Sequence, residues 1–294
     1  MTFDNPLNEP LALSAPFTLE LSRLACAPQS CGHGCAHYHG FWPFLRLMGM
    51  GKTMSGFSAE FIASIRAATQ KRQPAQSQIL ISGCADYSAY AHVWQACHDL
   101  PKPPAVTALD LCETPLALSR WYARQRASEL ATVCLNVLDY CPGPVFDLIV
   151  TSSFFGYFSP AQRRDLFRAY ASMLVPGGEF VFTTRLRSGP EDQAVGFSQA
   201  QRDEFVVRTR AALPQLDPSV PLSAQEAEQR ASDYADCLRT YPVNSTATLQ
   251  ALAAEAGLEW VSCLKRHTEA AQPGVTGPTV GEADYLFVTL RKPA

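Results

Sequence analysis

Charged side chains are scarce in this chain, and the two signs nearly balance. Asp, Glu, Lys and Arg make up 17% of the 294 residues, the net charge is −3, and no basic run is longer than two residues. A protein that binds nucleic acid through its phosphates needs a basic surface. We therefore expect no nucleic-acid partner.

Long apolar segments are also missing, although 47% of the residues are hydrophobic. No apolar run approaches the roughly 18 residues of a membrane-spanning helix. Residues 1–16 lack the basic region and apolar core of a signal peptide. We therefore expect a cytoplasmic protein with a packed core and no membrane partner, and the composition leaves its oligomeric state open.

The most informative stretch is an apolar run that stops at a glycine. Residues 78–88 read QILISGCADYS, and a second apolar run at 105–111, AVTALDL, ends near an acid. Strand, glycine turn, helix, strand and acid form the pattern of a nucleoside-binding crossover. In that pattern Gly83 lets the backbone approach a ligand, and Asp110 accepts hydrogen bonds from ribose hydroxyls.

Strand and helix patterns alternate from residue 79 onward. Apolar strands are expected at 79–82, 105–110, 131–136, 146–151 and 179–184, with two more at 258–265 and 284–290. Such alternation predicts an α/β fold with a parallel sheet covered on both faces. We expect residues 1–75 to form the helices of an N-terminal cap or lid, and residues 76–294 to form the main domain with a helical lid insertion at 187–245.

The segment from 145 to 182 carries the most specific motif. VFDLIVTSS at 145–153 is a phenylalanine–aspartate–aliphatic strand, and VPGGEFVF at 175–182 is a proline–glycine–glycine turn entering a strand. The pattern resembles the class I S-adenosylmethionine-dependent methyltransferases, closely over residues 79–186 and in architecture over 249–291. The resemblance implies a Rossmann-like, doubly wound, seven-stranded sheet, mostly parallel with the last strand antiparallel, and S-adenosylmethionine as methyl donor or substrate.

The resemblance also assigns cofactor-binding positions. It places Gly83, Cys84 and Ala85 beneath the methionine part, Asp110 and Leu111 at the ribose, Asn136 and Val137 at the adenine, and Ser152 and Phe154 at the sulfonium. The loop departs from the family pattern, because Ala85 stands where a second glycine is usual and Tyr87 where a third is common.

Candidate catalytic groups are few, because methyl transfer depends mainly on in-line positioning of donor and acceptor. The candidates after the fourth strand are Ser152, Ser153 and Tyr157, with neighbouring phenylalanines as an aromatic wall for the sulfonium. In the N-terminal segment, Tyr38, Trp42 and Arg46 have the spacing of one helix face. We expect them to close over the cofactor, with Arg46 paired to the methionine carboxylate. Candidates to line a lid are Arg185, Arg208, Tyr234 and Tyr241.

Cysteine is abundant, with ten residues scattered along the chain. We expect mostly buried thiols rather than disulfides. Residues 26–39 concentrate Cys26, Cys31, Cys35, His33, His37 and His39, with roughly the local spacing of zinc ligands. Because no second cysteine pair with standard spacing follows, we interpret the stretch as a loop at the mouth of the site and predict no metal. Metal binding is the alternative, and His39 is a candidate acid or base.

Three functions follow from these patterns. The first is methyl transfer from S-adenosylmethionine to a small molecule in secondary metabolism, because no basic surface suits a nucleic acid. The second is cyclisation of S-adenosylmethionine itself to azetidine-2-carboxylate with release of methylthioadenosine, as in the azetidine-2-carboxylate synthases. The third is a non-catalytic nucleoside-binding module.

Overall fold

The sheet is the frame that positions every other element. The computed structural model describes residues 7–26, 35–51, 53–269, 277 and 282–294. Its strands are β1 (Gln78–Ser82), β2 (Ala105–Asp110), β3 (Ala131–Cys134), β4 (Phe146–Ser152), β5 (Leu174–Leu186), β6 (Glu259–Glu269) and β7 (Glu282–Arg291), in the order β3-β2-β1-β4-β5-β7-β6. Strands β1 to β5 pair in parallel, and β7 is antiparallel to both β5 and β6. The predicted seven-stranded sheet is confirmed.

Helices cover both faces of the sheet, because alternate strand residues point to opposite sides. One face packs on α4 (Ser58–Arg72), α5 (Ser88–Cys97) and α6 (Glu113–Gln125), and the other on α7 (Pro160–Met173) and α10 (Thr246–Glu255). In β1, Ile79 and Ile81 enter the first core and Leu80 enters the second. Doubly covered strands explain the nearly continuous apolar runs in the sequence.

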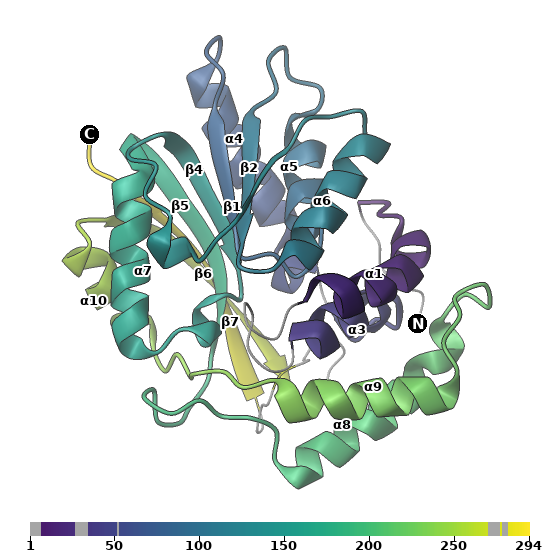
Figure 1. Cartoon of the computed structure of the whole chain (residues 1–294). Coiled ribbons are helices and arrows are strands. Elements are labelled where there is room, and N and C mark those ends of the chain that lie inside the picture. The colour runs from purple at the N-terminus through teal and green to yellow at the C-terminus, as the bar shows by residue number, and fades with distance from the viewer. Residues whose placement is uncertain (1–6, 27–34, 52, 270–276, 278–281) are drawn as a thin grey trace.

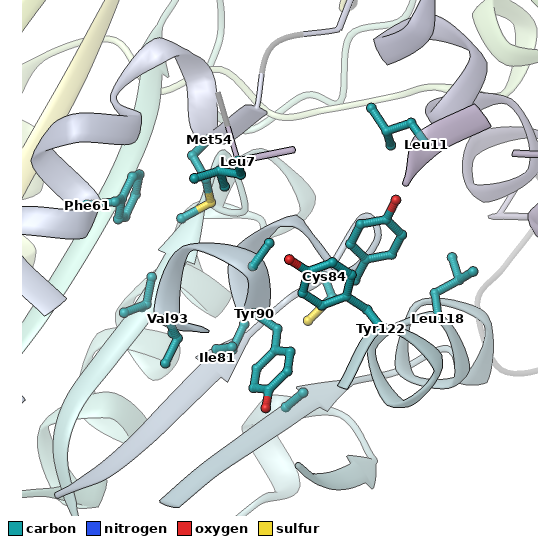
Figure 2. Close-up of a cluster of buried hydrophobic side chains, with 14 of the residues drawn as sticks. Leu7, Leu11, Met54, Phe61, Ile81, Cys84, Tyr90, Val93, Leu118 and Tyr122 are labelled. Atoms are coloured by element: carbon teal, nitrogen blue, oxygen red, sulfur yellow. The ribbon is translucent and has the colours of Figure 1, made fainter. Parts of the chain in front are cut away.

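The N-terminal segment packs into the first core. It comprises α1 (Leu11–Ala25), α3 (Cys35–Leu47) and the short helix η1 (Thr53–Gly56) before α4. Figure 2 shows Leu7 and Leu11 in one cluster with Cys84, Tyr122 and Ile81 of the sheet. The sequence predicted helices in this segment but placed none at residues 11–25, where Leu11 and Ala15 of α1 are fully buried.

The segment after β5 forms two helices, as predicted. They are α8 (Gln199–Ala212) and α9 (Ala224–Cys237), separated by the short helix η4 (Leu213–Gln215). Each begins with a capping box. The serine hydroxyl accepts from the backbone N–H three residues later, and the Gln or Glu side chain at that position accepts from the backbone N–H of the serine. Figure 1 shows α9 lying next to α3, with α8 on the outer side of α9.

Several strand bounds differ from the prediction, and β5 begins at Leu174, five residues before the predicted start. Strand β3 ends at Cys134 rather than at residue 136, because Asn136 caps the short helix η2 (Val137–Asp139) instead. Strand β6 continues to Glu269, four residues beyond the predicted end. Within the described ranges, no helix is both long and apolar enough to cross a membrane.

Candidate active site

A cavity of about 950 Å³ opens at the carboxyl ends of the parallel strands, between the sheet, α3 and the segment after β5. In doubly wound folds this edge is the ligand-binding edge. The sequence-predicted residues that line it are Tyr38, His39, Trp42, Arg46, Gly83, Cys84, Ala85, Asp110, Leu111, Asn136, Val137, Ser152, Ser153, Phe154 and Tyr157. The structure thus brings all of these predicted residues to one cavity, and their chemical roles are proposals taken up below.

The turn after β1 requires its glycine for two independent reasons. Gly83 has a φ of +74°, in the left-handed region that favours glycine. A Cβ atom at this position would lie 2.4 Å from the Phe154 ring, which packs on the turn from the end of β4. The turn therefore brings backbone and aromatic ring together at the floor of the cavity.

Asp110 is held rigidly at the end of β2. Its Oδ2 accepts from the backbone N–H of Cys84 at 2.7 Å, and its Oδ1 accepts from that of Cys112 at 2.8 Å. Burial raises the pKa of Asp110 to about 6, against the lowering by His39 and by these two bonds. At neutral pH the group is a carboxylate, with its remaining lone pairs available to hydroxyl donors.

The next strand end presents Asn136 and Val137. Asn136 Oδ1 accepts from the backbone N–H of Leu138 at 3.1 Å, which fixes the carboxamide at the start of η2. Val137 is buried behind it. Both residues lie at the same sheet edge as Asp110, one strand further out.

The end of β4 carries a strained residue. Ser153 has a φ of +53°, which is uncommon for a residue with a Cβ, and its N–H donates to Thr183 O at 2.8 Å. The Ser152 hydroxyl lies 2.8 Å from that of Thr183 on β5. Non-glycine residues in such conformations cluster at functional sites. The strain places Ser152, Ser153 and Phe154 at the cavity, next to the short helix η3 (Phe155–Tyr157).

Aromatic rings form the wall opposite the strand ends. Tyr38 stacks on Trp42 and on Tyr234 of α9, each at 5.7 Å between ring centroids, and lies edge-on to Tyr157 at 6.3 Å. Tyr157 keeps 45% of its surface exposed because its ring faces the cavity. Although its ring borders the cavity, the protein groups packed around the Tyr157 phenol desolvate it and raise its pKa to about 12, so the phenol is a hydrogen-bond donor rather than a base at neutral pH.

Arg46 lies at the cavity wall, but two buried carboxylates hold its guanidinium. Its Nη1 donates to Asp86 at 2.7 Å and its Nη2 donates to Glu9, and all three residues are at most 4% exposed. Asp86 also accepts from the backbone of Ser88 at 2.7 Å, at the start of α5. Through these contacts Arg46 joins the N-terminal segment to the glycine loop, and its pairing with a methionine carboxylate stays a prediction.

His39 lines the cavity and lies against sulfur atoms. Its Nδ1 lies 3.3 Å from Cys35 Sγ and 3.6 Å from Cys26 Sγ, and Cys112 completes the cluster. Cys31 and His33 lie outside the described residues, and His37 is paired with Asp233 at 3.6 Å. Sequence reasoning missed Cys112, although its position just after β2 placed it at this sheet edge.

The segment after β5 closes the remaining side of the cavity. Of the residues predicted to line a lid, Arg185, Tyr234 and Tyr241 do so, whereas Arg208 lies over the Phe205 ring instead. Further lining residues that the sequence reading missed are Arg187, Thr240 and Tyr285. No motif marks them, because they come from three separate places: the residue after β5, the return from α9 and strand β7.

A buried arginine fixes that return. Arg163 on α7 donates from Nη1 to Pro242 O and from Nη2 to Tyr241 O, both at 2.7 Å, and from Nε to Phe155 O at 3.0 Å. Three carbonyl oxygens bound by one guanidinium hold residues 241–242 against η3. The side chain of Tyr241 is thereby kept at the cavity.

Comparison with known proteins supports the fold assignment. No protein-family model and no curated protein matches the chain. Among solved structures, a protein from Galdieria sulphuraria assigned as a sarcosine dimethylglycine methyltransferase aligns with a TM-score of 0.50 at 16% identity, over 80% of this chain and 84% of its own. The strand order, the antiparallel β7 and this likeness define the Rossmann-like fold of class I methyltransferases.

Two further structures show similar overall likeness. The N-methyltransferase NodS from Bradyrhizobium japonicum, in complex with S-adenosyl-L-homocysteine, aligns with a TM-score of 0.48 at 16% identity, over 81% of this chain and 89% of its own. The 1,6-didemethyltoxoflavin-N1-methyltransferase from Burkholderia thailandensis, with its substrate and S-adenosylhomocysteine, aligns with a TM-score of 0.48 at 16% identity, over 80% of this chain and 79% of its own.

Proposed function

We propose that the protein binds S-adenosylmethionine in this cavity and transfers its methyl group to a small molecule. The observation that carries the proposal is the fixed Asp110 carboxylate beside the Gly83 turn, at the ligand-binding edge of a methyltransferase-type sheet. In this arrangement Asp110 binds the ribose hydroxyls, and Asn136 and Val137 lie beside the adenine. The Gly83 turn, with Cys84 and Ala85, runs beneath the methionine part.

The size and enclosure of the cavity support a small acceptor. A volume of about 950 Å³ is at the upper end of small-molecule sites, which leaves room for an acceptor beside the nucleoside. Residues 1–75 act as a cap and residues 187–245 as a lid in this proposal. Together they exclude water and a macromolecular substrate from the sulfonium.

The residues around the sulfonium position bind and orient rather than exchange protons. The rings of Tyr38, Trp42, Phe154 and Tyr157 attract a cation through their faces, an effect of about 0.5–2 kcal/mol. Ser152, Ser153 and the protonated Tyr157 phenol are the groups that orient an acceptor. Positioning alone accounts for a large share of such catalysis, because the sulfonium is already activated.

The same aromatic wall favours one alternative, cyclisation of S-adenosylmethionine. In that reaction the amine of the cofactor attacks its own γ-carbon, the carbon–sulfur bond breaks, methylthioadenosine leaves and the amine releases a proton to solvent. This chemistry needs a folded methionine tail and no acceptor. A closed cavity beside the Phe154 ring suits it as well as methyl transfer.

Incubation with S-adenosylmethionine alone, read by mass spectrometry, separates these functions. We expect bound, unconsumed cofactor, and S-adenosylhomocysteine only after an acceptor is added. Methylthioadenosine formed above the spontaneous rate would replace methyl transfer by cyclisation. Absence of binding in calorimetry would overturn both, whereas binding without any turnover would favour the non-catalytic nucleoside-binding module.

A matched pair of variants tests the carboxylate itself. Asp110→Asn is expected to weaken cofactor binding by about tenfold or more, because it removes a charged acceptor from two hydroxyl donors. Asp139→Asn, on the exposed outer side of η2, makes the same chemical change away from the cavity. Equal affinities for the two variants would contradict the assigned role of Asp110.

A further inference from the structure

Four metal-ligating side chains meet where the N-terminal segment touches the β2–α6 loop. They come from three separate parts of the chain: Cys26 after α1, Cys35 and His39 on α3, and Cys112 just after β2. One ligand atom from each lies within 4.8 Å of the other three. Cys26, His39 and Cys112 are at most 9% exposed, and Cys35 is half-buried.

Four of the six distances between these atoms are close to the edges of a tetrahedron around a metal ion. The Sγ atoms of Cys26 and Cys35 each lie 3.4 Å from that of Cys112. His39 Nδ1 lies 3.3 Å and 3.6 Å from Cys35 and Cys26. Bonds of about 2.3 Å to sulfur and 2.0 Å to nitrogen, at tetrahedral angles, give edges of about 3.8 Å between sulfurs and about 3.5 Å from sulfur to nitrogen. A small outward movement of the sulfurs would admit an ion.

Surrounding groups hold the ligands in place. Thr114 Oγ1 lies 3.0 Å from Cys26 Sγ, where its hydroxyl can donate to a thiolate. The backbone N–H of Cys112 is bound by Asp110, and the His39 ring packs edge-on to Tyr38 at 5.3 Å. Such outer contacts orient the ligands of metal sites.

We propose that Cys26, Cys35, Cys112 and His39 bind one thiophilic divalent cation, which their ligand type and geometry assign as zinc. Three thiols lose their protons to solvent, and three thiolates and a neutral imidazole form four bonds to the ion. Four protein ligands leave no open position, so the ion has a structural role. This site does not depend on methyl transfer, and it gives His39 a role other than acid or base.

The ion would fasten the cap to the cofactor-binding edge. Cys112 lies two residues after Asp110, whereas Cys35 and His39 are on the helix that carries Tyr38 and Trp42. Among the described residues, packed thiols, an imidazole and the Thr114–Cys26 contact join these two walls of the cavity here. Metal removal is therefore expected to loosen α3 from the β2–α6 loop.

The first test uses the unmodified full chain, purified in reductant without chelator. Elemental analysis is expected to give one zinc per chain. After chelator treatment, titration with Co²⁺ is expected to give visible d–d bands and a thiolate-to-cobalt charge-transfer band that saturate at one equivalent. A chain with no zinc and no such band after Zn²⁺ or Co²⁺ is supplied would overturn the proposal. So would a non-reducing mass spectrum two hydrogens lighter, with a disulfide mapped between two of these cysteines.

Variants then identify the ligands. Cys112→Ser and Cys35→Ser are expected to lose stoichiometric metal, whereas Cys134→Ser, whose exposed thiol lies near Leu111 O, retains it. The circular dichroism of each variant reports whether it folds, and the cobalt spectrum of the unmodified chain decides the matter independently. Chelation is expected to lower the melting temperature by about 5 °C or more. Unchanged metal content in both ligand variants would contradict the assignment.

Discussion

The two walls of the cavity are built by different physical means. At the strand ends, backbone geometry shapes the wall. It includes a left-handed glycine, a strained Ser153, and a carboxylate that accepts from two backbone N–H groups. On the N-terminal side, buried polar side chains from distant segments make the structure, as in the ion pairs of Arg46 with Glu9 and Asp86. The groups of the first wall stand at strand ends, which sequence periodicity marks, whereas the contacts of the second form only when separate segments of the folded chain meet.

This difference predicts how each wall responds to change. The strand-end wall is destabilised when a side chain is added to its glycine turn, because the surrounding atoms have no room to move. A wall of buried polar pairs fails when one partner is removed, because the remaining group is left without its charge or hydrogen-bond partner in a medium of low polarity. Substitutions on both sides test the contrast.

The largest effect is expected at Arg46. Arg46→Met leaves two buried carboxylates without their cation, and such losses typically cost about 3–5 kcal/mol of unfolding free energy. Denaturant unfolding without ligand measures this cost. Arg66→Met, which breaks a surface pair with Asp99, is the control and is expected to change stability little. If Arg46→Met kept full stability and lost only cofactor affinity, the structural role assigned to Arg46 would be wrong.

Gly83 tests the strand-end wall. Gly83→Ala forces a Cβ to within 2.4 Å of the Phe154 ring at a φ of +74°. We expect a loss of about 3 kcal/mol from strain and collision together. Gly143→Ala isolates the strain, because Gly143 has a φ of +81° and no atom within 4 Å of the added Cβ, and should cost about 1 kcal/mol. Equal losses in the two variants would remove the collision from the explanation.

The sequence predicted the first wall far better than the second. Strand runs, the Gly83 turn and Asp110 follow one another within one crossover, so period and spacing were enough to place them. The sheet and the helices α8 and α9 were predicted for the same reason. The role of Tyr87 could not be predicted in this way. It stands where a glycine is common in the family that the sequence resembles, and only the structure shows its ring stacked on Tyr122 at 4.7 Å between ring centroids.

The N-terminal wall could not be predicted because its contacts join segments far apart in sequence. Glu9 and Arg46 carry no motif that pairs them, and Cys112 is separated by 86 residues from Cys26. Helix α1 was missed since its buried positions include serines and threonines, which do not show an apolar stripe. The burial of small polar residues can be predicted only when the surface that covers them is known.

The contact between α4 and α5 predicts a pH dependence. His92 is buried, its Nδ1 donates to Ser88 O at 2.7 Å, and its Nε2 accepts from the Ser58 hydroxyl at 2.8 Å. Burial lowers the pKa of His92 to about 4 from an ordinary 6.5, although Asp86 nearby opposes this and Arg46 reinforces it. The unfolded chain therefore binds the proton more readily, and stability falls as the pH drops from about 6.5 to about 4.

Protonation of His92 lowers the free energy of unfolding by about 3 kcal/mol in full, and this loss is complete below pH 4 and absent above pH 7. Unfolding free energies measured between pH 7.5 and 5 for the unmodified chain and for His92→Gln check this, because carboxylates contribute equally to both. We expect a shallower pH dependence in the variant. Parallel curves for the two proteins would show that His92 does not titrate in this range.

The smallest effect is expected at the hydrogen bond that joins α1 to the glycine loop. It tests directly whether polar contacts hold the N-terminal wall. The Tyr87 hydroxyl lies 3.0 Å from that of Ser14. Tyr87→Phe keeps the stack on Tyr122 and removes only this bond, which is expected to lower the free energy of unfolding by about 1 kcal/mol. A double-mutant cycle with Ser14→Ala isolates the pair, since removing both partners leaves no buried hydroxyl unmatched. A coupling energy near zero would mean that α1 is held by apolar packing alone, and the two walls would then differ less than the buried polar contacts indicate.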